Sequence, residues 1–491
     1  MAWALILLGT VSASTVVSEG TAVSHETPAA ASPAQEEAPL AEPAAGPRPG
    51  AVGISLARAV ATALDRNFGI LAAGDSVAAA KLRETASRSQ FYPTLTPQYQ
   101  RSTDDQALAL DASQRLPWTG GRLSATAAFR SNLGAELPPT RFSDMRLLLT
   151  QPLLRGFGPN ATSYELVNSQ RARQSQERAL DLARQRLAVQ VAAAFYQIVQ
   201  QRQLLAVAEQ SLKRSDGLRR ASEARLEVGL VSKLDVFRAQ LQASQAEESM
   251  IRAQAALEDA LERFRVLLGL APTDPTEPEA VTLPDPPGDA PEPVEVLVSR
   301  ALANRRELEE TRDQVTDARR AVALTRQSLL PQLDLNLGLT RGGFGNSLGE
   351  SFRAADRGFT FFVTTSYPLA RSAAVAAKAT AEIEVAARGR GLEQRRLEIE
   401  SEVRGAAREM ERIRKSVDLQ RQAVEVAERQ LRLATLRYQR GLASNFDVVD
   451  AEGSLILART ALVGLRTSYQ VARIELLRVT GALDPAREFA P

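Results

Sequence analysis

The sequence contains no cysteine, and its only histidine is His25. The lack of cysteine excludes a disulfide framework, a thiol nucleophile and any cysteine-ligated metal. His25 lies in a segment that we expect to be disordered, so the folded part also lacks the commonest general base and metal ligand. We therefore predict no enzymatic activity, no metal site and no cofactor. The alternative is an enzyme whose catalytic groups are carboxylates alone.

An excess of charge of one sign and long apolar runs are missing as well. The 60 Lys and Arg residues are balanced by 58 Asp and Glu residues, for a net charge of +2. Nucleic-acid binding needs a large basic field, so we expect no nucleic-acid partner. No apolar stretch reaches the roughly 18 residues that a transmembrane helix needs, which predicts that no such helix is present.

The first residues resemble a targeting segment. Residues 1–13 combine a short apolar run, Ala2 to Gly9, with the small residues Val11-Ser12-Ala13. This pattern predicts a signal peptide, although the usual basic start is missing; an unstructured apolar N-terminus is the alternative. Residues 14–50 are rich in Ala, Pro, Ser and Glu and are predicted to be a disordered lead-in.

The most informative positive feature is a segment that occurs twice, at 225–246 and at 437–458. The copies share seven residues at a constant separation of 212 positions: Arg225/Arg437, Gly229/Gly441, Leu230/Leu442, Ser232/Ser444, Asp235/Asp447, Val236/Val448 and Ala239/Ala451. Each copy is a glycine-centred turn between two long helical patterns. The chain is therefore predicted to contain a duplicated helical hairpin.

The duplication extends to two halves, 51–270 and 294–482, with a Pro-rich linker at 271–293 and a C-terminal tail at 483–491. Each half begins with a helical pattern, at 54–90 and at 294–330. An extended section, a very long helix, the glycine turn and a second helix follow in the same order.

The extended sections alternate apolar and polar residues, which predicts strands with one apolar and one polar face. The stripes are Leu333-Leu335-Leu337-Leu339, Met145-Leu147-Leu149 and Phe359-Phe361-Val363, with a sparser one at Leu95 and Tyr99. Each run has the length of about ten residues that a tilted strand needs to cross a bilayer. We expect about four such strands, although a soluble sheet packed on helices is the alternative. Residues 107–131 make a further hairpin that is either an extracellular loop or a pair of added strands.

The long helices carry apolar residues every seven positions, which predicts coiled-coil packing. The seams are Val191, Ile198, Leu205, Leu212 and Leu226 in the first half, and Val403, Met410, Val417, Val424, Leu431 and Tyr438 in the second. A helix from Tyr164 to Val228 would span roughly 95 Å, whereas the returning helix would cover only about 54 Å. We predict that helices of the other half complete the length, with 294–330 stacking on 233–268 and 54–90 stacking on 445–480.

Four strands cannot close a barrel, because the smallest membrane barrels have about eight, and lipid does not tolerate open sheet edges. The strands are therefore expected to close only in a homo-oligomer, in which the helices would also close into a tube.

Both tips match the pattern R-x-x-x-G-L-x-S-x-x-D-V, and the runs Thr150 to Gly158 and Tyr367-Pro368-Leu369 resemble the strand-to-helix exits of a known family. With these motifs the chain resembles the TolC-type outer-membrane efflux channel family over about residues 51–482. The resemblance implies an α+β membrane protein and a homotrimer. Its duplicated coiled-coil hairpins would form a periplasmic α-barrel, and its strands a shared twelve-stranded β-barrel in outer-membrane lipid of a Gram-negative bacterium. It also implies passive export, driven by an inner-membrane pump through a periplasmic adaptor.

The tip residues have a structural and a functional interpretation. The glycines permit the left-handed geometry that ends a helix, and Ser232-x-x-Asp235 and Ser444-x-x-Asp447 predict capping boxes. The resemblance implies that the tips also form a periplasmic rim on which the adaptor docks. With two tips in each chain, a trimer would offer six docking sites. The rim residues are Gly229, Leu230, Val231, Ser232 and Asp235 in the first tip, and Gly441, Leu442, Ala443 and Ser444 in the second.

Asp447 and Asp450 are three residues apart and share a helix face. The resemblance implies that they ring the periplasmic entrance, where six carboxylates would raise each other's pKa values and attract cations. A capped, solvated helix face is the alternative. The first tip has Arg238 at the position that corresponds to Asp450. Only the second tip of each chain would therefore line the entrance. Tyr438 matches a family position that latches the closed tips, but it is also the last residue of the seam.

These observations together predict the exit duct of a tripartite efflux system that exports small molecules. The duct of a type I protein secretion system is an alternative within the same family. A soluble coiled-coil scaffold is an alternative of another class, which explains the heptads but not the amphipathic strands. Aromatic residues make up only 5% of the chain, and Trp118 and Tyr92 are candidates either for a membrane-interface girdle or for loop packing.

Overall fold

The computed structural model describes residues 50–103, 105–132, 141–286, 292–353 and 355–488. The signal peptide predicted for 1–13 and the lead-in predicted for 14–50 lie outside these residues, apart from Gly50 at the end of the lead-in.

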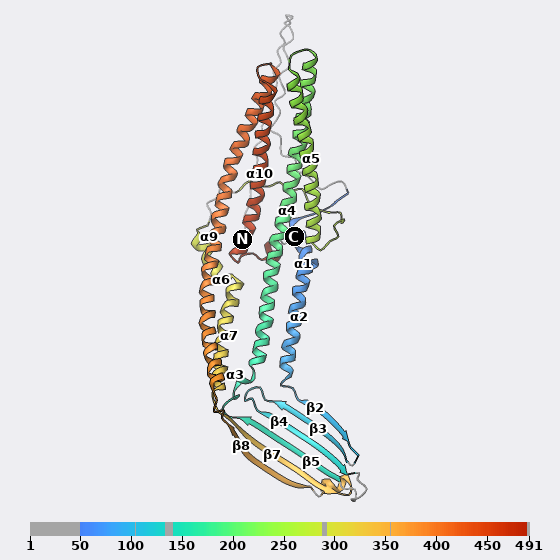
Figure 1. The fold of residues 1–491 in the computed structure, drawn as a ribbon, viewed down its shortest axis with the longest axis vertical. Coiled ribbons are helices and arrows are strands. Elements are labelled where there is room, and N and C mark those ends of the chain that lie inside the picture. Colours follow the sequence, from blue (N-terminus) through green and yellow to red (C-terminus); the bar gives the residue numbers. More distant parts are fainter. Residues whose placement is uncertain (1–49, 104, 133–140, 287–291, 354, 489–491) are drawn as a thin grey trace, which may run out of the picture. The chain divides into compact units, whose positions relative to one another are not determined.

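Two helices far longer than the others dominate the described residues (Figure 1). The first half contains α1 (Leu56–Arg66), α2 (Phe68–Ser89), α3 (Pro159–Thr162), α4 (Tyr164–Glu227) and α5 (Lys233–Leu267). The second half contains α6 (Val294–Asn304), α7 (Arg306–Ser328), α8 (Leu348–Arg353), α9 (Ser372–Gln439), α10 (Asn445–Val479) and α11 (Pro485–Glu488). In the part of the chain that is described, none of these helices combines the length and apolarity needed to cross a membrane.

The predicted heptad seams are buried where the long helices pack. Val191, Ile198 and Val403 are 0% exposed, and Val417 is 1% exposed. α4 packs along α5, α9 packs along α10, and the two hairpins meet through α4 and α10. Apolar burial along these seams, rather than helix propensity, is what stabilises helices of this length.

The shorter helical patterns are each interrupted at an equivalent point that the sequence analysis missed. Asn67 separates α1 from α2, and Arg305, 238 positions later, separates α6 from α7; both have extended backbone angles. The Oδ1 atom of Asn67 accepts a hydrogen bond from the backbone N–H of Gly69 at 2.9 Å, which caps the start of α2. Each pattern therefore forms two helices.

The predicted stacking of helices between the two halves is wrong. α5 ends against the first break, where Asn67 Nδ2 donates to the carbonyl of Leu267 at 2.9 Å. α10 ends against the second break, where a Cβ on Gly481 would lie 3.1 Å from the Cβ of Asn304. Each returning helix thus continues into the helix pair of its own half. The reason is that α2 and α5 both pack along α4, whereas α7 and α10 both pack along α9.

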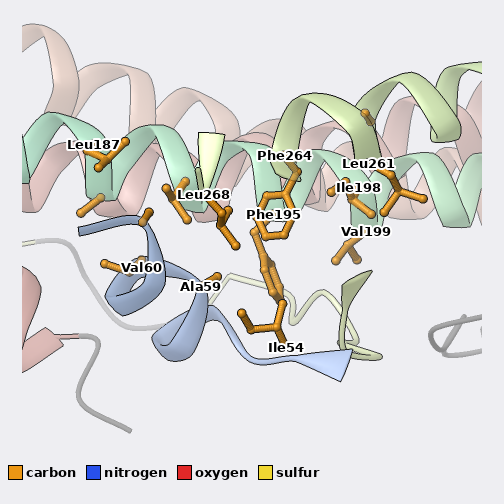
Figure 2. Close-up of a cluster of buried hydrophobic side chains, with 14 of the residues drawn as sticks. Ile54, Ala59, Val60, Leu187, Phe195, Ile198, Val199, Leu261, Phe264 and Leu268 are labelled. Atoms are coloured by element: carbon orange, nitrogen blue, oxygen red, sulfur yellow. The ribbon is translucent and has the colours of Figure 1, made fainter. Parts of the chain in front are cut away.

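A hydrophobic core surrounds the first break, where α1, α5 and strand β1 (Val52–Ile54) meet the middle of α4 (Figure 2). Phe195 of α4 and Phe264 of α5 are 1% and 0% exposed, and their ring centroids are 6.3 Å apart in an edge-on arrangement. Burial of such aromatic side chains contributes strongly to stability. β1 also pairs in parallel with β6 (Thr276–Pro278), which ties the linker to this core.

The extended sections form one antiparallel sheet of six strands. In spatial order these are β2 (Thr94–Arg101), β3 (Asp105–Arg115), β4 (Arg122–Asn132), β5 (Arg141–Pro152), β7 (Gln332–Gly345) and β8 (Asp356–Ser366). The expectation of about four strands is therefore corrected to six. β3 and β4 come from the 107–131 hairpin and pair with each other and with β2 and β5. The sequence alone could not decide whether this hairpin is a loop or a pair of added strands, because both have the same local pattern.

The strand register places all the predicted apolar stripes on one face of the sheet. Leu147 pairs with Leu339, which pairs with Phe359, and Ala125 of the added hairpin lies beside Leu147. The opposite face carries polar side chains that hydrogen-bond across strands, as between Thr150 and Asn336 at 2.9 Å.

Candidate functional site

The two turns that join the long helices have the same backbone geometry. Gly229 and Gly441 have φ angles of +74° and +71°, in the left-handed region that other residues adopt only with strain. The N–H of Leu230 donates to the carbonyl of Arg225 at 2.9 Å, and the N–H of Leu442 donates to the carbonyl of Arg437 at 2.8 Å. These bonds satisfy carbonyls that a helix end would otherwise leave unpaired.

The next helix begins in the same way in both tips. Ser232 and Asp235 form a complete capping box at the start of α5, and Ser444 and Asp447 form one at the start of α10. Asp447 Oδ2 accepts from the backbone N–H of Ser444 at 2.8 Å. The capping prediction is confirmed, with Asp in place of the usual Glu or Gln.

The rim residues between these caps present apolar side chains to solvent. Leu230 and Leu442 are 74% and 67% exposed, and Val231 and Ala443 beside them are half-buried. Both glycines and both serines are exposed. A leucine held at the apex of a capped turn has little contact within its own chain, so it is available to a partner.

Tyr438 lies between the two hairpins rather than on an open surface. It is 5% exposed, and its hydroxyl lies 3.1 Å from the hydroxyl of Ser222 on α4. The guanidinium of Arg225 lies 4.3 Å from the centroid of the Tyr438 ring. The same guanidinium donates to the carbonyls of Tyr438 and Gln439 at 2.8 and 3.2 Å. Arg225 therefore binds the last turn of α9 by a cation–π contact and two charge-assisted hydrogen bonds.

Two further contacts between the hairpins were missed in the sequence. Asn445, 1% exposed, donates from Nδ2 to the carbonyl of Asp235 at 2.9 Å. Arg214 of α4 binds the buried carboxylate of Glu452 of α10 at 2.8 Å. In the sequence, these residues could be noticed only as polar residues at buried positions of the helical pattern. That indication is weak, because other buried positions, such as Ser215 and Ser222, are polar as well. We refer to Arg225, Tyr438, Ser222, Asn445 and the Arg214–Glu452 pair as the tip latch.

A crevice of about 280 Å³ lies beside the tip latch, between the two hairpins. Its lining includes Leu218, Ala221, Leu431, Thr435 and Val449, from helices of both hairpins. Apolar packing between the hairpins is incomplete at this crevice, so the polar contacts of the tip latch join them beside it.

The two predicted gate carboxylates both lie on the exposed face of α10, away from the tip latch. Asp447 is engaged by the cap at Ser444, and Asp450 lies one turn further along the helix. In the first tip, Asp235 has Arg238 at 4.0 Å instead of a second carboxylate. The difference in charge that the sequence predicted between the tips therefore lies on accessible surface.

Comparisons with known proteins agree with this geometry. The family model of the outer membrane efflux proteins matches residues 59–270 and 297–482. The outer-membrane efflux pump protein TtgC and the antibiotic efflux pump protein ArpC, both of Pseudomonas putida, are each 25% identical to the chain over 324 residues. That alignment covers 64% of this chain and 63% of either relative.

Solved structures share the fold. The outer-membrane protein VceC of Vibrio cholerae is 16% identical with a TM-score of 0.66, over 87% of this chain and 96% of VceC. The outer-membrane channel MtrE of Neisseria gonorrhoeae is 17% identical with a TM-score of 0.61, over 87% of this chain and 88% of MtrE. These likenesses confirm the predicted α+β fold class, in which duplicated long helical hairpins are joined to one β-sheet. The family match, which covers more than half of the chain, shows that the protein belongs to the outer membrane efflux protein family.

Proposed function

We propose that this protein is the outer-membrane exit duct of a tripartite efflux system, through which small molecules pass without catalysis by the chain itself. The observation that carries the proposal is the two-faced sheet joined to helical hairpins with matched, exposed tips. The apolar face suits lipid and the polar face suits a water-filled interior. The helices, at about 1.5 Å per residue, extend the duct by roughly 100 Å, a distance that suits the periplasm.

The apolar face has the boundaries that a bilayer would impose. Along β7 it runs from Leu333 to Leu339 and then changes to Arg341, and on β8 the neighbouring position is Arg357. Along β2 it ends at Arg101. Charged residues at the end of an apolar band are typical of the headgroup region, where their charges remain hydrated.

Closure of the duct requires more than one copy of the chain. Within the described residues, β2 and β8 each pair on one side only, so the sheet has two open edges. The outer helices also carry exposed apolar stripes near the tips. These are Leu234, Phe237 and Leu241 on α5, and Leu419, Val426 and Leu433 on α9. We propose a homotrimer in which β2 pairs with β8, and α5 packs on α9, of the adjacent copy.

The tips are assigned two roles in this proposal. Leu230 and Leu442, with the rim residues around them, form the surface on which a periplasmic adaptor docks. Asp447 and Asp450 line the entrance, where their charges favour cations. The tip latch, centred on Tyr438, holds the two hairpins of each chain together and keeps the entrance narrow. The pump that delivers the exported molecules acts through the adaptor.

Single-channel conductance in planar bilayers tests the duct. Detergent-purified protein should give a small, cation-selective conductance, and the combined Asp447→Ala and Asp450→Ala substitutions should enlarge it and reduce the selectivity. Absence of conductance, in a protein that stays in solution without detergent, would replace the duct with a coiled-coil scaffold. Unchanged selectivity in the double variant would keep the duct but remove the carboxylates from its gate.

Docking is tested separately from conduction. The combined Leu230→Asp and Leu442→Asp substitutions should abolish export of ethidium in cells that depend on this protein, while leaving the bilayer conductance unchanged. Leu433→Asp, on an exposed stripe below the tips, is the control for assembly and should lower the yield of trimer instead. Export that survives the rim substitutions would argue against docking at the tips.

A further inference from the structure

The sheet holds two strands more than the long helices account for. β2 follows α2, β5 leads through α3 into α4, β7 follows α7, and β8 leads into α9. β3 and β4 have no helix of their own and connect only to neighbouring strands. They occupy the position between β2 and β5.

The four helices next to the sheet form a row in the same order as their strands. Ion pairs join α2 to α4, α4 to α7 and α7 to α9: Glu84 with Arg173 at 2.7 Å, Arg178 with Glu310 at 2.6 Å, and Arg326 with Glu382 at 3.9 Å. The row is therefore α2–α4–α7–α9, and the matching strands are β2, β5, β7 and β8.

The added strands match the width of the sheet to the width of this row. Four helices about 9 Å apart span about 36 Å. Strands about 4.8 Å apart and tilted by about 40° each occupy about 6.3 Å of a barrel's circumference. Four strands would then span about 25 Å and six strands about 38 Å, by the same spacing and tilt. Six strands match the width of the helix row with an ordinary tilt, whereas four strands would match it only with a much steeper tilt.

The turn end of the hairpin is in close contact with the segment that connects β5 to α4 on one side and with the residues after α2 on the other. Gly120 has a φ of +79°, and a Cβ there would lie 2.4 Å from the carbonyl oxygen of Gly156 and 2.9 Å from Thr162 Oγ1. Gln151 Nε2 donates to the carbonyl of Thr119 at 3.0 Å. On the other side, Gln114 Nε2 donates to the carbonyl of Phe91 at 3.3 Å. A turn that is held on both sides is not a free loop.

The hairpin also has the two faces and the length of a membrane strand pair. Leu108 and Phe129 are paired on the apolar face, and Asp111 accepts a hydrogen bond from Thr126 at 2.7 Å on the polar face. Both strands have 11 residues, enough to cross a bilayer at a tilt. Trp118 in the turn is 78% exposed, as expected of an aromatic side chain at headgroup level.

We propose that the β3–β4 hairpin is part of the transmembrane wall, so that each subunit contributes six strands. Three copies then close a barrel of 3 × 6 = 18 strands, a wide outlet that continues the helical tube without a step. This inference rests on the proposed function, because it requires the sheet to lie in lipid.

Cysteine labelling in nanodiscs tests the inference directly, because the chain has no native cysteine. Neighbouring alanines give matched variants: Ala112→Cys and Ala127→Cys on the apolar face, and Ala109→Cys and Ala128→Cys on the polar face. Leu147→Cys and Leu148→Cys are the equivalent pair in β5. A membrane-impermeant maleimide should label Ala109→Cys, Ala128→Cys and Leu148→Cys at least tenfold faster than the other three. In denaturing detergent all six should label equally.

The control strand separates the possible failures. If all four hairpin variants label rapidly while Leu147→Cys stays protected, the hairpin lies outside the bilayer and the inference is overturned. If Leu147→Cys also labels rapidly, the sheet is not in lipid and the proposed function itself fails. Electron cryo-microscopy of the same nanodiscs should show 18 strands around a three-fold axis; twelve strands in a trimer would overturn the inference.

Discussion

The two tips are built alike but contact their surroundings differently. Gly229 and Gly441, with the capping boxes that follow them, have the same geometry. Arg225 is part of the tip latch, whereas its counterpart Arg437 is exposed. Lys233 is exposed, whereas its counterpart Asn445 is buried. The two copies share the residues that shape the backbone, but they differ in which positions contact the other hairpin, and even the shared arginine makes that contact in one copy only.

The largest expected difference between the tips is between Arg225→Ala and Arg437→Ala. Loss of Arg225 removes the cation–π contact and two hydrogen bonds to the end of α9, which together contribute roughly 2 kcal/mol. The hairpins should separate more easily, so the bilayer conductance should increase several-fold. Arg437→Ala should change it little. Equal effects of the two variants would show that the latch does not depend on contacts within one chain.

The two glycines should respond equally, because their geometry is the same. Gly229→Ala and Gly441→Ala each place a Cβ in a left-handed conformation, which costs about 1–2 kcal/mol. No atom outside the turn lies within 4 Å of the added Cβ in either case, so strain of the backbone alone sets the cost. Hydrogen exchange should accelerate to the same extent in both tips. A clear difference between the exchange rates of the two tips would indicate that one tip is held by contacts from another subunit.

Asp450→Ala should reduce cation selectivity, and Arg238→Ala at the aligned position should not. A cation about 4 Å from one hydrated carboxylate gains about 1 kcal/mol, or about fivefold in occupancy. Reversal potentials in a salt gradient measure this, and they should become less sensitive to the variant at high ionic strength. A larger change with Arg238→Ala would place the first tip, and not the second, at the entrance.

The smallest effect concerns the two breaks between helices, which differ in chemistry. Asn67 makes neutral hydrogen bonds, whereas Arg305 forms ion pairs with Glu307 and Glu402. Burial by itself would raise the pKa of Glu307, but the hydrogen bond and charge of Arg305 outweigh it and lower the pKa below its ordinary 4.5. This stabilisation is present above about pH 4.5 and is lost as the pH falls through the lowered value.

Hydrogen exchange at neutral and acidic pH, expressed as protection factors, measures this difference. The start of α7 should lose protection below pH 4.5, and the start of α2 should not. Glu307→Gln should remove the pH dependence at α7. Loss of protection at both breaks together would mean that acid acts on the whole fold instead.

Much of the fold could be predicted because it depends on local signals. Ser232 and Ser444 placed the starts of α5 and α10 correctly, and both helices end within one residue of the expected position. The alternation in Leu333 to Leu339 identified β7 and its apolar face. The family resemblance carried by the twin tips is confirmed by the match to the outer membrane efflux proteins.

Apart from the local breaks at Asn67 and Arg305, the errors concern contacts between segments far apart in the sequence. The end of α5 meets Asn67, about 200 residues earlier, and not the helix that follows the linker. The added strands could not be assigned from 107–131 alone, since their place depends on pairing with β2 and β5 and on the fit of Gly120 against Gly156. Burial of Asn445 depends on the approach of the other hairpin.

The sequence by itself therefore determined where the helices beside the tips begin and end, which faces are apolar, and that a hairpin unit is duplicated. These properties arise from capping, periodicity and backbone preference, which act within a few residues. Only the tertiary structure decided which helices share a groove, that the sheet has six strands, and that Arg225 rather than Arg437 joins the two hairpins. Those choices depend on packing between distant segments, where two equivalent sequence patterns can have different neighbours.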